Sequence, residues 1–361
     1  MKIGQMVFLV IDMIIKLCNS VFEAIKRKDS NTECFIEDLL NARRNGFISI
    51  LLSKRDILFL LDNLNLTNRQ KAILKFDKEK STYINSKLRS FNESVVFYHP
   101  FYGGSVGDYD ISKYRDNLFD DILEPLGKAN VIFENKDDDL VYRKILEWYL
   151  KEVVKSIDLQ LSYTAIHGGG HTTASLSEEL INKKIGLFTV CDSDKISPYS
   201  EFGKTAKDTI DVFNSMGLQS RLLCIEAHEV ENLVPITFHN EVSLDTQKPS
   251  LEFIKKSEVI CSDSYIYYDF KDSFKVSLLS SKNQCGNYWN DIVQAIGFDV
   301  SDKSNSDKIV GKLSSMVKHS IKLFNESKVI TIPDNESLYN EWIKIGSFLL
   351  PKVIASKPYR M

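Results

Sequence analysis

The sequence predicts an α/β fold built on a doubly wound parallel sheet, with mainly helical regions before and after it. From about residue 128 to residue 227, short apolar runs alternate with amphipathic helical patterns. Such alternation with short links is typical of parallel strands joined by crossover helices. The chain has 361 residues, of which 43% are hydrophobic, which is sufficient for two packed domains.

The N-terminal domain, residues 1–127, is expected to be mainly helical and to serve substrate or partner binding. Asp12 and Lys16 interrupt its first apolar run, so a core-facing amphipathic helix over 1–25 is expected instead of a membrane span or signal peptide. Apolar residues at helical spacing then predict helices near 20–28, 34–44, 56–66 and 67–80, the last starting with a Thr67–Gln70 capping box.

A change of pattern follows these helices. Residues 93–105 combine β-branched and aromatic residues with Pro100 and a glycine pair, which indicates a strand or extended loop. A polar helix and a Pro125–Gly127 break over 111–130 place the domain boundary at residue 127.

The central domain, residues 128–245, carries the alternation itself. Strands are predicted over 130–134, 162–167, 186–194 and 220–227, and helices over 139–157, after the glycines at 168–170, and over 204–217. The C-terminal extension, residues 246–361, is expected to hold an aromatic strand over 265–275, several helices and a solvated loop over 301–308.

Charge and cysteine usage narrow the class of protein. A net charge of −3 excludes a globally basic nucleic-acid protein, so any nucleic-acid contact must be local. None of the six cysteines forms a CxxC pair, which argues against a zinc knuckle and fits a reducing cytoplasm. A cytoplasmic protein without a membrane anchor is therefore expected.

Three groups of acidic residues follow the predicted strands. They are Glu134, then Asp192 with Asp194, then Glu226 with Glu229 and Glu231. The carboxyl ends of parallel strands open into one crevice, where several carboxylates repel each other unless a hard cation lies between them. The pattern predicts a Mg²⁺ site and phosphate chemistry. A polar turn at 192–194, and simple helix-start charges at 137–139, are the structural alternatives.

A glycine run lies between the second strand and its helix. The amides of Gly168, Gly169 and Gly170 could approach a phosphate at the following helix N-terminus. A tight strand-to-helix turn explains the same residues equally well.

The segment ENKDD at 134–138, followed by a helix, and DSD at 192–194, after a strand, resemble the Toprim domain. Toprim is the metal-binding fold of topoisomerases, DnaG-type primases and nucleases of the overcoming-lysogenization-defect family. The sequence keeps Glu134, Asp138, Asp192 and Asp194 of that pattern but has Asn135 where glycine is usual. The resemblance covers about residues 128–240 and implies that these four carboxylates bind Mg²⁺ or Mn²⁺.

The segment HEVEN at 228–232 is similar to the acidic Glu-x-Glu-Asn element of Toprim nucleases from bacterial defence systems. This resemblance implies that Glu229 and Glu231 complete a second metal position or orient the attacking water. It also implies a lysine that stabilises the scissile phosphate. Lys271 is the first candidate for this role, and Lys275 and Lys282 are the next candidates. A solvated Lys271 is the alternative.

The expected function is a metal-dependent endonuclease acting on DNA or RNA as an anti-phage effector. The chain lacks the GxxxxGK[ST] motif, so a separate ATPase partner is expected by analogy. The flanking regions would provide substrate reading, homo-oligomerisation or a partner surface. A non-catalytic Toprim module that binds nucleic acid or a protein is the alternative. A primase would need a zinc-binding or basic template-reading segment, and none is evident in the sequence. A topoisomerase would need a catalytic tyrosine on a separate large domain, for which the chain is too short.

Overall fold

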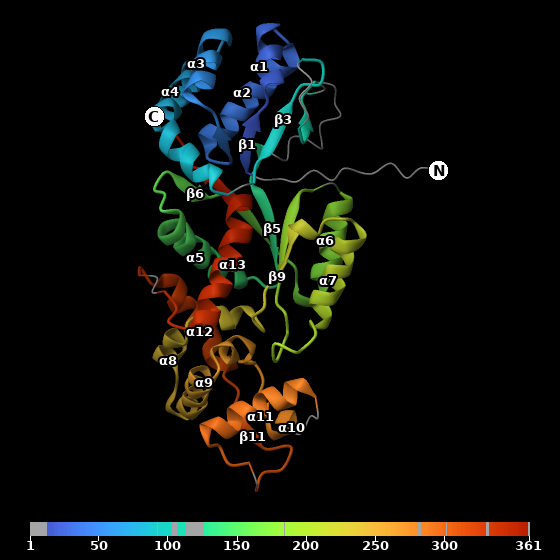
Figure 1. Cartoon of the computed structure of the whole chain (residues 1–361), viewed down its shortest axis with the longest axis vertical. Helices are drawn as coiled ribbons and strands as arrows, with labels where there is room; N and C mark the ends of the chain where they lie inside the picture. Colours follow the sequence, from blue (N-terminus) through green and yellow to red (C-terminus); the bar gives the residue numbers. More distant parts are fainter. Residues whose placement is uncertain are drawn as a thin grey trace, which may run out of the picture.

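Three tiers follow one another along the long axis of the molecule (Figure 1). The computed structural model describes residues 13–91, 93–102, 107–112, 114, 126–183, 185–279, 283–300, 302–329 and 332–359. The N-terminal tier lies at one end, the central sheet lies in the middle, and α10 (Val276–Leu279), α11 (Gln284–Ile296) and β11 (Lys308–Val310) lie at the other end. Among the described helices, none is long and apolar enough to cross a membrane.

The N-terminal tier is a second α/β unit. Its helices are α1 (Asn19–Lys26), α2 (Ser30–Asn45), α3 (Lys54–Asn63) and α4 (Asn68–Arg89), and its strands are β1 (Ile14–Leu17), β2 (Ser49–Leu51), β3 (Val95–Tyr98) and β4 (Tyr109–Asp110). The strands form a parallel sheet in the order β2-β1-β3-β4. The four helices near the predicted positions are present, and the Thr67–Gln70 capping box is confirmed. The sequence predicted a mainly helical region, but it did not predict this sheet.

The predicted helix over residues 1–25 is wrong at Ile14–Leu17, although its end, from Asn19 on, is helical. Ile14–Leu17 is a strand, and the helix begins only at Asn19. Ile14 and Ile15 are both fully buried, so this run is apolar on both faces, as parallel strands are. A short continuous apolar run does not distinguish a buried strand from a buried helix. Residues 1–12 and most of the predicted boundary segment at 111–125 lie outside the described residues.

The central sheet confirms the predicted parallel alternation. Its strands are β5 (Ala129–Phe133), β7 (Tyr163–His167), β8 (Leu187–Cys191) and β9 (Leu222–Cys224), in the order β7-β5-β8-β9. Every pairing is parallel. The crossover helices are α5 (Asp138–Trp148), α6 (Thr173–Asn182) and α7 (Lys204–Ser215).

Helices cover both faces of this sheet. Ile132 of β5 packs in a cluster with Ile181 of α6 and Phe213 of α7. On the opposite face, the ring of Phe133 stacks on Tyr142 of α5, with centroids 5.1 Å apart. Neighbouring residues of one strand therefore point to opposite layers, as a doubly wound sheet requires.

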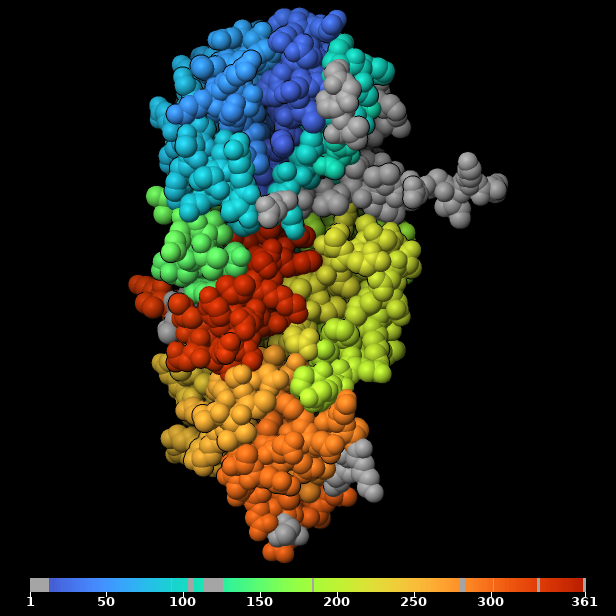
Figure 2. Space-filling model, in the orientation of Figure 1, coloured from blue at the N-terminus to red at the C-terminus, as the bar shows by residue number. Residues whose placement is uncertain are grey.

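Part of the C-terminal region packs on the central tier, and the rest lies beyond that tier. The helices α12 (Ser314–Glu326) and α13 (Glu336–Val353) pack against α5, and β12 (Ile354–Ser356) pairs antiparallel with β6 (Leu159–Leu161). Trp342 of α13 meets Trp148 of α5 edge to face. α5 continues as a π-helix, η3 (Tyr149–Val154), whose Tyr149 ring lies against Gly346. Figure 2 shows these C-terminal residues, in red, on the surface between the other tiers.

The remaining elements form the far tier and its connection to the sheet. They are α8 (Ile236–Val242), α9 (Lys248–Ile260), β10 (Phe274–Lys275), α10 (Val276–Leu279), α11 (Gln284–Ile296) and β11 (Lys308–Val310), with the short 3-10 turns η6 (Val230–Leu233), η7 (Asp245–Gln247) and η8 (Ser262–Tyr267). Two further 3-10 turns, η4 (Gly170–Thr172) and η5 (Gln219–Arg221), belong to the central sheet region. The strand predicted over 265–275 is wrong for its first part, which is the 3-10 turn η8. Tyr265, Tyr267 and Tyr268 are all buried, so the aromatic residues do not alternate between core and solvent.

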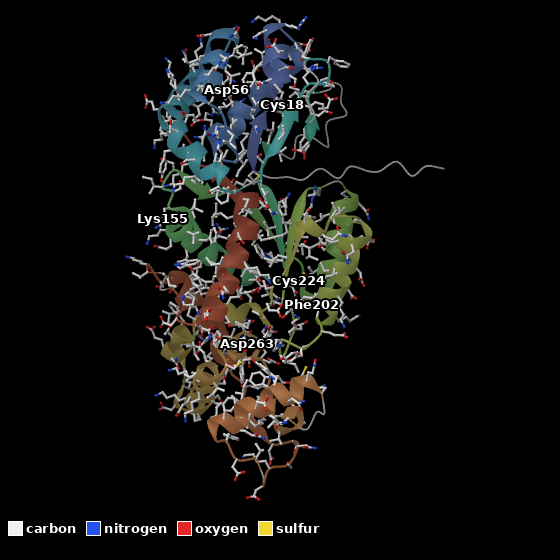
Figure 3. All side chains as sticks on the ribbon, viewed as in Figure 1. Cys18, Asp56, Lys155, Phe202, Cys224 and Asp263 are labelled. Carbon is white, nitrogen blue, oxygen red and sulfur yellow. The ribbon has the colours of Figure 1, made fainter. Side chains whose placement is uncertain are left out.

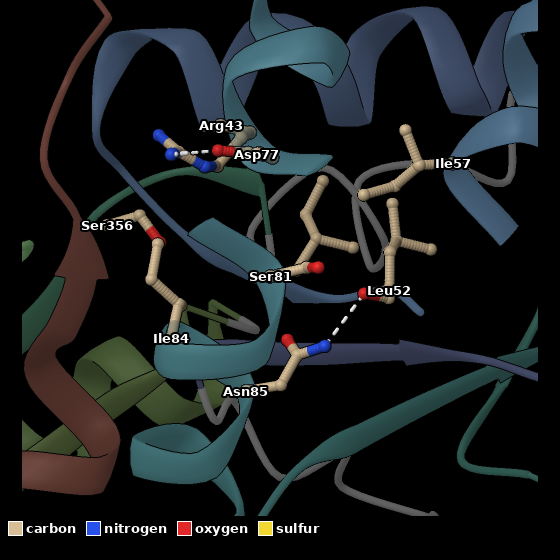
Figure 4. A pocket seen from close by; sticks show the side chains of 9 residues that line it. Arg43, Leu52, Ile57, Asp77, Ser81, Ile84, Asn85 and Ser356 are labelled. Atoms are coloured by element: carbon tan, nitrogen blue, oxygen red, sulfur yellow. Dashed lines mark hydrogen bonds and ion pairs between the residues drawn. The ribbon is translucent and has the colours of Figure 1, made fainter. Parts of the chain in front are cut away.

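The end of the chain returns to the N-terminal tier. Arg43 of α2 forms a buried ion pair with Asp77 of α4 at 2.6 Å and donates from Nη1 to the carbonyl oxygen of Lys357 at 2.9 Å. The hydroxyls of Ser49 and Ser356 are 3.1 Å apart. Figure 4 shows the small pocket at this joint, with Arg43 and Asp77 on one side of it. This junction ties the first tier to the strand that closes the central one.

Candidate metal centre

Two acidic residues follow neighbouring strands at the carboxyl edge of the central sheet. Glu134 comes directly after β5, and Asp192 comes directly after β8. Both are buried, with 9% and 5% of their surface exposed, and Glu134 Oε1 accepts a hydrogen bond from the Asp192 amide at 3.0 Å. The parallel pairing of β5 and β8 therefore brings the two carboxylates to the same point. Figure 3 shows Cys224, the last residue of β9, near this edge in the middle of the molecule.

A third buried carboxylate is added by the helix after β5. Asp138 is the first residue of α5, is 3% exposed, and accepts the Asn135 amide at 2.8 Å. Asn135 has no positive φ, so this turn does not need the glycine that is usual in Toprim domains. A carboxylate in the first turn of a helix is a generic stabiliser, but a fully buried one lacks the water that normally solvates it.

Asp192 and Asp194 do not share a face, contrary to the extended segment that the spacing predicts. The strand ends at Cys191, and Asp194 has a left-handed φ of 54°. Asp194 is exposed, and its side chain lies against Gly203 at the start of α7. Its charge still acts on Glu134. The structure therefore places Asp192 inside the carboxylate group and Asp194 at its margin.

The third acidic group, Glu226, Glu229 and Glu231, does not act as one unit. Glu226 is paired with other residues, whereas Glu229 and Glu231 join the acidic centre. Glu226 accepts from Lys195 Nζ at 2.7 Å and from the Tyr267 hydroxyl at 2.9 Å. Glu229 and Glu231 instead lie 3.0 Å from a single cation, the Nζ atom of Lys271. Glu229 and Glu231 are thus the members of this group that face the other carboxylates.

The 3-10 turn η6 directs Glu229 and Glu231 to the same side. Glu229 caps the turn with its backbone extended, and its amide donates to Asn232 Oδ1 at 3.1 Å. The Asn232 side chain is fully buried and donates to the carbonyl oxygens of Tyr265 and Tyr268 at 2.8 and 2.7 Å. Asn232 therefore holds the acidic turn against the segment that carries Lys271.

Burial and mutual repulsion disfavour the charged forms of these carboxylates. Burial, with the charges of Asp194 and Asp138, raises the pKa of Glu134 to about 7. Burial, with the charge of Glu231, raises the pKa of Asp138 to about 7. Burial and the same neighbours raise the pKa of Asp192 well above its ordinary range. Buried carboxylates that destabilise one another in this way are stabilised by a divalent cation.

The donor set fits a hard divalent cation. Four carboxylates (Glu134, Asp138, Asp192 and Glu231) are each less than a tenth exposed. The Oε2 atoms of Glu229 and Glu231 are buried and accept no hydrogen bond from the part of the chain that the structure describes. Buried oxygens without a donor are costly, and carboxylate oxygens are the ligands that Mg²⁺ and Mn²⁺ prefer.

Lys271 is the cation that the chain itself supplies to this centre. Burial alone would lower the pKa of Lys271, but Glu231 and Glu229 outweigh it and raise the pKa above its ordinary value. Its side chain keeps 43% of its surface exposed, so it borders solvent. Lys275 is an exposed residue of β10, and Lys282 lies outside the described residues.

Two of the three glycine amides at 168–170 are used within the chain, which favours the tight turn over the phosphate cradle. The amides of Gly168 and Gly170 donate to the carbonyl oxygens of Phe133 and Glu134 at 2.7 and 3.0 Å, so neither is available to a ligand. A Cβ on Gly168 would meet the Thr173 hydroxyl at 2.2 Å, and Gly169 and Gly170 have positive φ. The run is a tight turn that fixes the end of β5, and with it the backbone of Glu134.

Two residues at this site were not predicted as ligands from the sequence. His228, which is 7% exposed, and Asp269 lie beside Glu229, and one ligand atom of each of the three lies within 4.8 Å of the others. Asp269 precedes Lys271 in a turn whose amides donate to its Oδ1 atom. The histidine of HEVEN was the available signal, but nothing in the sequence places Asp269 beside it.

Comparison with protein-family models, curated proteins and solved structures gives no match to this chain. The α/β class and the parallel sheets rest on the structure itself, and the function is argued from the site.

Proposed function

We propose that this protein is a Mg²⁺- or Mn²⁺-dependent nuclease of the Toprim type that hydrolyses phosphodiester bonds in DNA or RNA. The observation that carries the proposal is the meeting of Glu134, Asp138, Asp192 and Glu231 from separate segments at the carboxyl edge of a parallel sheet. This edge is where open α/β sheets bind their ligands. The order of the acidic segments along the chain supports the Toprim type.

The residues divide into ligands and a phosphate-facing cation. Glu134, Asp138, Asp192, Glu229 and Glu231 would hold the divalent ion or ions, with Asp194 at the margin. A bound ion would supply Lewis-acid polarisation of the phosphate and a hydroxide nucleophile at neutral pH. Lys271 reaches the centre from the solvent side, where it can contact an anionic backbone once a metal replaces its ion pairs. A nuclease of this kind would act as an anti-phage effector with a separate ATPase partner.

Incubation of the purified protein with Mn²⁺ or Mg²⁺ tests the proposal. Plasmid DNA, single-stranded DNA and tRNA serve as substrates, beside Asp192→Asn and Glu134→Ala. The wild type should cleave at least one substrate, EDTA should abolish the cleavage, and both variants should reduce the rate by about 100-fold or more, as removal of a metal-site carboxylate does. Glu241→Gln, an exposed change on α8, is the matched control. A variant that cleaves as fast as the wild type would refute the assignment.

One observation favours a second candidate, a Toprim module that binds nucleic acid or a protein without cleaving. Lys271 already forms ion pairs with both Glu229 and Glu231 without a metal, so part of the repulsion in the acidic centre is offset by the chain itself. Metal titration separates the two candidates, because a binding module would show nucleic-acid or protein binding with no Mg²⁺- or Mn²⁺-dependent cleavage.

A further inference from the structure

Three side chains beside the acidic centre form a cluster of different chemistry. His228 and Glu229 are consecutive residues before η6, and Asp269 lies in the loop after η8. One ligand atom from each lies within 4.8 Å of the others. The set combines one imidazole nitrogen with two carboxylate oxygens, whereas Glu134, Asp138, Asp192 and Glu231 offer oxygen alone.

The ring of His228 is held as a ligand would be. Its Nδ1 atom lies 3.0 Å from the carbonyl oxygen of Lys195, which can only accept, so Nδ1 carries the hydrogen. In the neutral ring this leaves the lone pair on Nε2, which points toward Asp269 Oδ2 at 3.8 Å. That distance is too long for a hydrogen bond. A backbone carbonyl behind one ring nitrogen is the usual arrangement of a metal-bound histidine.

The backbone around His228 is fixed on both sides. Its amide donates to the carbonyl oxygen of Ile266 at 2.6 Å, and its own carbonyl accepts from the Asp194 amide at 2.9 Å. The side chain is 8% exposed. A rigid backbone and a buried ring leave the ring in one orientation, which is what a preformed metal site requires.

The two carboxylates still have free oxygens for an ion. Asp269 Oδ1 accepts two backbone amides at 2.7 and 2.8 Å, and its Oδ2 atom faces His228. Glu229 gives Oε1 to Lys271, while its Oε2 atom is buried with no donor among the described residues. Two ligands of one ion are roughly 3.0–3.5 Å apart at bond lengths of about 2.1 Å, so side-chain shifts of about 1 Å would close the set.

We propose that His228, Glu229 and Asp269 bind a first-row transition-metal divalent cation. An imidazole ligand favours such ions over Mg²⁺, which prefers oxygen ligands and retains its waters; the preference is strongest for Zn²⁺ and weaker for Co²⁺ and Mn²⁺. Glu229 belongs to both sets, so this ion lies next to the oxygen-only position. The inference extends the proposed function by giving the centre a metal preference, and it rests on that function only for the use of the ion in cleavage.

Electron spin echo spectroscopy of the Mn²⁺-loaded full-length protein tests the site directly, since the signal of bound Mn²⁺ reports a directly bonded imidazole nitrogen. The wild type should show this nitrogen coupling, and His228→Gln should lose it. Asp269→Asn keeps an oxygen for the two backbone amides, so it should fold and should weaken Mn²⁺ binding by about ten-fold or more, measured by calorimetry. His319→Gln, exposed on α12, is the histidine control and should change neither signal.

The outcomes separate this site from the nuclease activity. Mn²⁺ that binds without nitrogen coupling would overturn the site and leave the proposed nuclease intact. Nitrogen coupling without any cleavage would support the site and count against the nuclease. An unchanged coupling in His228→Gln, or Mn²⁺ affinity unaltered by Asp269→Asn, would show that His228 and Asp269 form only an ion pair.

Discussion

Replacing Glu134 by glutamine should stabilise the metal-free protein at alkaline pH. Burial raises the pKa of Glu134 from its ordinary 4.5 to about 7, so the folded protein holds this proton more tightly than the unfolded chain does. A raised carboxyl pKa contributes stability that is fully present below pH 4.5 and is lost as pH rises through about 7. Glutamine remains neutral, so the variant does not suffer this loss.

The magnitude follows from the same values. One pKa unit corresponds to about 1.4 kcal/mol, so the rise from 4.5 to about 7 amounts to about 3 kcal/mol at pH 8. Glutamine keeps an oxygen that can accept the Asp192 amide, which Glu134 accepts at 3.0 Å, so the change removes charge with little loss of hydrogen bonding. A difference of about 3 kcal/mol is a large part of the stability of a typical domain.

Urea unfolding in EDTA at pH 4.5 and pH 8 measures the effect. The variant should exceed the wild type by about 3 kcal/mol at pH 8 and match it at pH 4.5, while Glu241→Gln should match the wild type at both. Mn²⁺ should stabilise the wild type at pH 8 by about 2.7 kcal/mol at a hundred-fold excess over its dissociation constant, and should stabilise the variant less. A variant no more stable than the wild type at pH 8 would refute the argument that Glu134 is held at an electrostatic cost.

Three further substitutions test contacts elsewhere in the structure. Lys271→Met removes the cation that two glutamates share; it should destabilise the metal-free protein by about 1–3 kcal/mol at pH 8, and Mn²⁺ should restore more of the melting temperature than in the wild type. Arg43→Met leaves the carboxylate of Asp77 buried without its partner, so unfolding by urea should show a loss of about 3–5 kcal/mol, and a loss below 1 kcal/mol would contradict the ion pair. Gly346→Ala places a Cβ 2.1 Å from the Tyr149 ring and should cost about 1–3 kcal/mol through overpacking, whereas an unchanged melting temperature would show that α13 does not pack on η3 this closely.

The central sheet could be predicted because its signals are local. Each apolar run is followed within a few residues by a helical pattern, and that order alone dictates parallel strands. Glu134 and Asp192 lie at strand ends, so their meeting follows from the register of two neighbouring strands. The strand Ile14–Leu17 was missed because a short apolar strand and a buried helix look the same over four residues.

The rest of the centre depends on contacts between distant segments. Lys271 reaches Glu229 across 42 residues, and Asn232 fixes that approach through two carbonyl oxygens of an aromatic 3-10 turn. The sequence predicts that turn as a strand, which would aim its side chains differently. Asp269 beside His228 follows from the same turn, so no spacing rule could have paired them.

The antiparallel pair of β6 and β12 has a consequence for how the chain reaches its fold. β6 is synthesised soon after Glu134 and Asp138, but its partner, Ile354–Ser356, is synthesised almost 200 residues later. The face of α5 stays uncovered until α13 has been synthesised. A ribosome-bound chain that already contains every metal ligand therefore still exposes apolar surface of its central tier, and a fragment limited to residues 128–245 should aggregate instead of folding.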